Sequence, residues 1–221
     1  MEEKDIIIIK KSQDNRITLS SKGLEIRRKG KPVKFESSGI GFVYLLIDCS
    51  SSMAEGNKLT QAKKGAIEFA KKAIAQGYFV GLIRFDSYAD CLCEPTREIS
   101  LLKQKVEMLD PGGFTFMAKA ISLAHKTLKN VRGERIIVVA TDGEPNGPGD
   151  PETSLAAGEA AKRDRIEIIA IGTDDADWNF LRKLASRKDL GIKVPQQKFG
   201  ETIALAAKNL PQLESKKKGG G

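Results

Sequence analysis

From residue 39 onward, short apolar runs alternate with longer segments whose apolar residues recur every three or four positions. The short runs are typical of buried strands, and the longer segments are typical of helices that pack on a sheet. This alternation favours βαβ units and therefore a mostly parallel sheet. We expect an α/β protein with a Rossmann-like, doubly wound sheet, helices on both faces and an antiparallel edge strand.

The individual elements follow from the same two patterns. The expected strands are residues 42–47, 79–85, 90–94, 135–141 and 166–171, of which 90–94 is the edge strand. The expected helices are residues 58–75, 98–108, 116–129, 151–161, 178–186 and 201–209. Asp150 is the expected N-cap of the fourth helix, with Pro151 at its first position, because a proline there needs no backbone N–H.

The two ends of the chain differ from this body. Residues 1–38 hold β-branched runs separated by polar turns, which predicts a small N-terminal β-hairpin appendage. The chain ends in Lys-Lys-Lys-Gly-Gly-Gly, a composition typical of flexible segments. The expected division is an appendage at 1–38, an α/β domain at 39–212 and a flexible basic and glycine-rich tail at 213–221.

The net charge of +8 is concentrated at the two ends. Residues 1–38, 39–195 and 196–221 carry an excess of +4, +1 and +3. Because nucleic-acid binding needs cations gathered on one surface, a nearly neutral body disfavours nucleic acid as a partner. The apolar runs are too short to span a bilayer and the N-terminus is too charged for a secretory signal, so we expect a cytoplasmic protein. The sequence indicates no oligomeric state.

Oxygen-bearing side chains follow the first predicted strand. Asp48, Ser50 and Ser52 are spaced by two, which points alternate side chains to the same side of an extended backbone. Ligands of open α/β sheets bind at the carboxyl ends of the strands. Oxygen donors at that position suit a hard cation such as Mg²⁺.

Two further oxygen donors are placed to join this group. Thr115 follows the flexible pair Gly112-Gly113 just ahead of a predicted helix, and Asp142 is the first acid after the strand at 135–141. Each lies at a strand end or helix start that packs against the same sheet. The sequence therefore predicts a divalent-metal site at this edge.

These residues resemble the motifs of von Willebrand factor A-like domains that have a metal-ion-dependent adhesion site, in particular the stand-alone prokaryotic type. That family has Asp-x-Ser-x-Ser after the first strand, a Thr in a Gly-rich loop before a later helix, and an Asp after the fourth strand. The matching residues here are Asp48, Ser50, Ser52, Thr115 and Asp142. The resemblance covers about residues 40–210, and Phe114 departs from it because many relatives carry a hydroxyl residue there.

The resemblance implies a divalent ion, usually Mg²⁺ with Mn²⁺ or Ca²⁺ as alternatives, held by Ser50, Ser52 and, in the engaged state, Thr115. Asp48 and Asp142 would act through ordered waters and hydrogen bonds. Neutral hydroxyls leave the cation under-neutralised, so an Asp or Glu of a partner protein can complete its coordination. We expect a non-enzymatic, metal-dependent protein-interaction module, and the family suggests an ATPase, a kinase or a phosphatase as its partner.

Two other interpretations of the motif stay open at this point. Asp-x-Ser-x-Ser alone is often a turn with a helix cap, because Asp and Ser bond nearby backbone amides. A Mg²⁺-dependent haloacid dehalogenase-like phosphatase would use Asp48 as its nucleophile. Ser50 stands where such an enzyme needs its second acid, and a hydroxyl cannot replace a carboxylic acid as proton donor near neutral pH.

Overall fold

A computed structural model of the protein describes residues 7–12, 15–20, 23–28, 31–34, 39–146 and 150–213. Residues Ile40–Leu213 form one compact unit, and the N-terminal strands belong to another. Apart from residue 213, the predicted tail lies outside the described residues. That residues 39–212 fold independently of the N-terminal segment stays a prediction.

The N-terminal segment is a four-stranded antiparallel sheet rather than a single hairpin. Its strands are adjacent in chain order: β1 (Ile7–Ser12), β2 (Asn15–Ser20), β3 (Gly23–Arg28) and β4 (Lys31–Lys34). An isolated two-stranded hairpin is marginally stable in water, whereas additional strands satisfy more of the backbone.

The larger unit contains a six-stranded sheet in the order β10-β9-β8-β5-β6-β7. Its strands are β5 (Gly41–Asp48), β6 (Tyr78–Phe85), β7 (Ala89–Thr96), β8 (Glu134–Thr141), β9 (Glu167–Gly172) and β10 (Gly191–Lys193). The pairs are parallel except β6 with β7, so the antiparallel edge strand is confirmed. The sequence did not predict β10, because three residues are too few for a periodic pattern.

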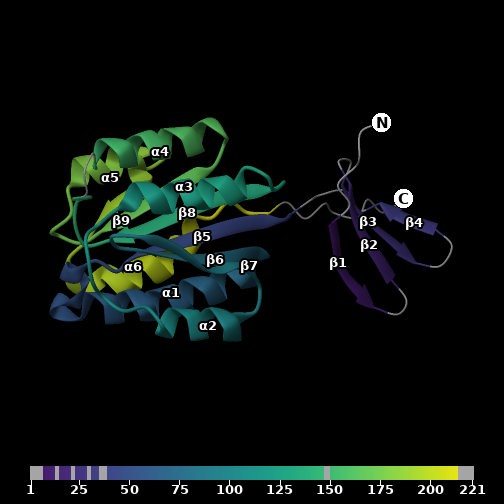
Figure 1. The fold of residues 1–221 in the computed structure, drawn as a ribbon, viewed down its shortest axis with the longest axis horizontal. Coiled ribbons are helices and arrows are strands. Elements are labelled where there is room, and N and C mark those ends of the chain that lie inside the picture. The colour runs from purple at the N-terminus through teal and green to yellow at the C-terminus, as the bar shows by residue number, and fades with distance from the viewer. Residues whose placement is uncertain are drawn as a thin grey trace. The chain divides into compact units, whose positions relative to one another are not determined.

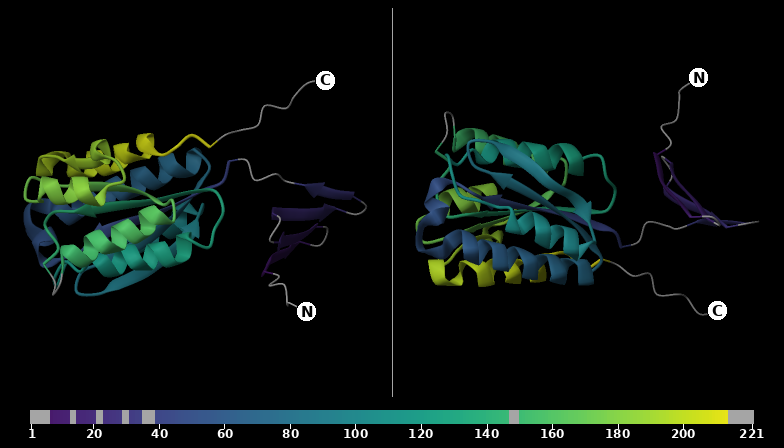
Figure 2. Two further views of the ribbon diagram at one scale, coloured as in Figure 1. Left: turned by 90° about the horizontal axis from the view of Figure 1, so that it is seen from above. Right: turned by 60° about the horizontal axis from the view of Figure 1, so that its bottom comes forward.

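Helices cover both faces of this sheet, which confirms the predicted fold class (Figures 1 and 2). They are α1 (Lys58–Ala75), α2 (Ile99–Glu107), α3 (Met117–Leu128), α4 (Glu152–Arg163), α5 (Trp178–Leu184) and α6 (Phe199–Leu205). Short 3₁₀ helices lie at Ser51–Asn57, Lys188–Leu190, Gln196–Lys198 and Ala206–Asn209. In Figure 1, α1, α2 and α6 lie on one face and α3, α4 and α5 on the other. Among the described residues, none of the helices is both long and apolar enough to cross a membrane.

Two helix ends differ from the prediction. The fourth helix has Pro151 at its N-cap and begins at Glu152, one residue later than expected. The Asp150 carboxylate accepts hydrogen bonds from the Ser154 hydroxyl (2.9 Å) and the Thr153 hydroxyl, and these bonds replace the expected cap. The segment predicted as a helix over 201–209 is α6 followed by a tighter 3₁₀ turn, as is common at helix ends.

Helices α1 and α6 approach each other closely enough for their backbones to touch. A Cβ atom on Gly65 would lie 2.4 Å from the backbone oxygen of Gly200, and one on Gly200 would lie 2.4 Å from that of Gln61. Only glycine fits at this crossing, because backbone atoms cannot turn aside as a side chain can.

We expect Gly65→Ala to lower the free energy of unfolding by about 1–3 kcal/mol, because the added methyl group overpacks the crossing. This loss opposes the gain of about 1 kcal/mol that alanine brings to an unhindered helix. Chemical denaturation measures the change, and exposed Lys64→Ala on the same helix is the control. A Gly65→Ala protein as stable as the control would mean that the two helices separate without loss.

Candidate metal centre

The carboxyl ends of β5 and β8 are neighbours at the point where the strand order reverses. β5 pairs with β6 on one side and with β8 on the other, and Ile47 is opposite Ala140. Chain connections leave in opposite directions from such a point, which opens a crevice where ligands of open α/β sheets bind. This register brings Asp48, the last residue of β5, beside the end of β8.

The Asp48 carboxylate is fully buried and held on both oxygens. Its Oδ1 accepts from the backbone N–H of Ser50 at 2.8 Å, and its Oδ2 accepts from the Thr141 hydroxyl at 2.6 Å. Burial raises the pKa of Asp48 to about 7, although the hydrogen bonds from Thr141 and Ser50 act in the opposite direction. The site therefore holds an ionised Asp48 only against a substantial desolvation penalty.

Two serine hydroxyls connect this loop to the other buried acid. The Oγ atoms of Ser50 and Ser52 are 3.1 Å apart, and the Ser52 hydroxyl donates to Oδ1 of Asp142 at 2.9 Å. Ser50 is the N-cap of the following 3₁₀ helix, yet its side chain makes no capping hydrogen bond. The capping interpretation therefore does not account for the Ser50 hydroxyl, which points toward Ser52 instead.

Thr115 lies buried in a loop that is hydrogen-bonded to both other loops. The Gly113 carbonyl accepts from the backbone N–H of Ser51 at 3.1 Å, and Gly112 N–H donates to the Cys49 carbonyl at 2.7 Å. The backbone N–H of Thr115 donates to Oδ1 of Asn146 at 2.9 Å. The structure thus brings together the three loops that carry the five predicted residues.

Lys58, at the start of α1, is part of the same cluster, and the sequence did not predict it. Its Nζ donates to Oδ2 of Asp142 and to Oδ2 of Asp175, each at 2.9 Å, and the residue is only 3% exposed. Burial opposes its charge, but the bonds to the two aspartates outweigh burial and raise the pKa of Lys58. One signal was available, because a cation is unfavourable in the first turn of a helix, where the dipole is positive.

The chemistry of these side chains fits a hard divalent cation. The donors that converge are hydroxyl and carboxylate oxygens, which suit Mg²⁺, Mn²⁺ or Ca²⁺, whereas zinc sites use nitrogen and sulfur. Over the residues that the structure describes, no group of three or more His, Cys, Asp or Glu side chains is placed to hold a metal. A cation here would therefore depend on the Ser and Thr hydroxyls.

Comparison with known proteins agrees with the fold. The family model for the von Willebrand factor type A domain matches residues 43–207. The von Willebrand factor domain of the type V pili tip protein Mfa5 from Porphyromonas gingivalis is similar in structure, with a TM-score of 0.70 and 15% identity. That match covers 79% of this chain and 96% of the pilus domain, and at this identity it shows the fold alone.

Curated relatives are similar over part of their length. The magnesium-chelatase 67 kDa subunit of Chlorobaculum tepidum is 30% identical over 145 residues, which is 62% of this chain but only 23% of the subunit. A UPF0353 protein of Mycolicibacterium paratuberculosis is 31% identical over 144 residues, or 59% of this chain and 43% of that protein. The chain therefore spans less than half the length of either relative.

Proposed function

This chain belongs to the von Willebrand factor type A domain family, and we propose that it is a non-enzymatic, divalent-metal-dependent protein-interaction module. In this proposal a Mg²⁺ ion at the carboxyl edge of the sheet recruits an Asp or Glu side chain of a partner protein. The main support for this proposal is the chain of hydrogen bonds from Ser50 through Ser52 to Asp142. It lies where the strand order of the sheet reverses, between β5 and β8.

Each residue has a defined part in this proposal. Ser50, Ser52 and Thr115 would hold the ion through their hydroxyls, and a bound ion would supply a positive centre that a carboxylate can approach. Asp48 fixes the loop by accepting from Ser50 N–H, and Asp142 orients the Ser52 hydroxyl. Because the hydroxyls are neutral, the protein leaves part of the ion's charge for the partner's acid to balance.

The class of partner is a proposal from the family. One relative is named as a subunit of a magnesium chelatase, and the stand-alone members suggest an ATPase, a kinase or a phosphatase as the partner. This chain spans 23% of the chelatase subunit, so that protein's activity is not carried over. A cytoplasmic location stays a prediction.

We expect saturating Mg²⁺ or Mn²⁺ to raise the melting temperature, because a ligand that binds only the folded state stabilises it by mass action. The gain is about 2.7 kcal/mol at a ligand concentration of about 100 times Kd. Differential scanning calorimetry with the metal or with EDTA measures the rise. Asp142→Ala and Ser52→Ala should remove it, and Ser52→Ala leaves the ion pair between Lys58 and Asp142 in place.

The matched control is Asp189→Ala, which removes an exposed carboxylate outside the cluster and should keep the full metal response. A wild-type melting temperature that does not change with millimolar metal would contradict the proposed site. An enzyme would give another result: Mg²⁺-dependent hydrolysis of a phosphomonoester that Asp48→Asn abolishes. That outcome would replace the binding module with the phosphatase alternative.

A further inference from the structure

Large aromatic side chains are exposed next to the loop that carries Thr115. Tyr88 is 71% exposed and Phe114 is 59% exposed, whereas Thr115 between Phe114 and Phe116 is buried. Phe116, on the other side of Thr115, is partly buried. We define the aromatic rim as Tyr88, Phe114 and Phe116.

The aromatic rim is held in a fixed arrangement. The rings of Phe114 and Phe116 are stacked with their centroids 6.0 Å apart and their planes 13° from parallel. The backbone N–H of Phe114 donates to the Ser87 hydroxyl at 3.0 Å. Gly113 has a φ of +79°, and a Cβ atom there would lie 2.5 Å from Ser87 Oγ, so glycine permits this close approach.

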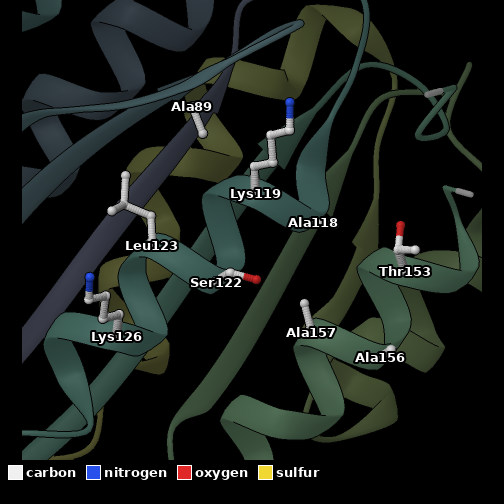
Figure 3. Close-up of a pocket in the computed structure, with 9 residues that line it drawn as sticks. All are labelled: Ala89, Ala118, Lys119, Ser122, Leu123, Lys126, Thr153, Ala156 and Ala157. Carbon is white, nitrogen blue, oxygen red and sulfur yellow. The ribbon is translucent and has the colours of Figure 1, made fainter. Parts of the chain in front are cut away.

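Lys119 of α3 places a positive charge within the rim. Its Nζ lies 4.8 Å from the ring centroid of Phe116 and 5.8 Å from that of Tyr88. It also donates to the Ser87 carbonyl at 3.4 Å. Figure 3 shows Lys119 beside a shallow pocket along α3 whose apolar lining includes Ala89, Ala118, Leu123 and Ala157. Lys119 therefore adds a cation to the aromatic rim, and it also lines the neighbouring apolar pocket.

We propose that the aromatic rim and Lys119 form a second contact for the partner and determine which acidic segments the module accepts. The occupant is a partner segment in which the metal-binding Asp or Glu has a large apolar residue within a few positions and a second acid for Lys119. Pre-ordered aromatic side chains are typical anchors of interfaces, because they bury large areas while losing little conformational freedom. This inference rests on the proposed function.

The test is a selection of random peptides displayed on phage, made with immobilised wild-type protein in Mg²⁺ and in EDTA. We expect peptides that need Mg²⁺ and that combine an acid with a nearby Phe, Trp, Leu or Tyr. A synthetic copy of such a peptide should bind Phe114→Ser at least about tenfold more weakly, the size of a typical interface anchor. Lys119→Met should weaken binding only of peptides with a second acid.

Leu205→Ser is the control, since Leu205 is an exposed apolar residue of α6, on the opposite face of the sheet from α3 (Figure 1). It should bind the peptide as the wild type does. Peptides enriched under Mg²⁺ for an acid but for no apolar neighbour would contradict the role of the aromatic rim. Unchanged binding by Phe114→Ser would contradict it as well. Neither result would contradict metal-dependent binding. The absence of Mg²⁺-dependent enrichment would overturn both.

Discussion

Lys58→Met is expected to lower the free energy of unfolding by about 3–5 kcal/mol, the usual result of removing one partner of a buried ion pair. The variant leaves the Asp142 carboxylate, which is 1% exposed, without its counter-charge. Methionine keeps an unbranched apolar stem nearly as long as that of lysine, so most of the loss is that of charge rather than of packing. The pair with Asp175 adds little, because that side chain is 66% exposed and its charge is screened by water.

Urea denaturation in EDTA at neutral pH measures this change. The control is Lys64→Met, an exposed lysine on the same helix, which should stay within about 0.5 kcal/mol of the wild type. Excess Mg²⁺ should recover part of the stability of Lys58→Met, because a bound cation would again offset the charge of Asp142. A variant as stable as the control would mean that water reaches Asp142 and replaces the lysine.

Much of the fold could be predicted because local patterns of apolar and polar residues specify its helices and strands. The predicted bounds of α1, residues 58–75, are those observed, since its apolar stripe is regular and a glycine follows its end. The parallel sheet follows from the alternation of buried runs with amphipathic segments. β10 could not be predicted, because its three residues become a strand only by pairing with β9.

The candidate site shows the same division between local and distant information. Asp48, Ser50 and Ser52 are recognisable from their spacing in one loop, and the register between β5 and β8 brings Asp142 to them. Lys58 is different, because its role depends on Asp142 and Asp175, which are 84 and 117 positions away in the chain. No pattern within α1 specifies those partners, apart from the unfavourable position of a lysine at a helix start.

Asp48→Asn is expected to make the metal-free protein more stable at pH 8, by an amount on the order of 4 kcal/mol for a shift of about three pKa units. The pKa of Asp48 is about 7 in the folded protein and 3.8 without its surroundings, because burial disfavours the anion. Well below pH 3.8 both states are protonated, so Asp48 leaves stability unchanged. From pH 4 to 7 the unfolded chain releases its proton first, and stability falls as pH rises. Above about 7 the loss is complete.

Asparagine suits the same hydrogen bonds without the charge. Its carbonyl oxygen can accept from Ser50 N–H, and its amide can donate to the Thr141 hydroxyl. Thr141 lies 3.0 Å from the Gly143 carbonyl and can donate there instead. Subtracting the two stability curves, both measured in EDTA, removes the contribution of carboxylates far from Asp48. The difference should be near zero well below pH 3.8, grow toward pH 7 and then level off.

Magnesium should narrow the stability difference between the two proteins at pH 8. The wild type gains stability from the metal because an ionised Asp48 favours a nearby cation, whereas Asp48→Asn gains much less. An Asp48→Asn protein that is less stable than the wild type in EDTA at every pH would mean that the carboxylate stabilises the fold without metal. The expected results instead make Asp48 a residue that weakens the metal-free protein and increases its stabilisation by metal, as a binding site selected for its ligand would do.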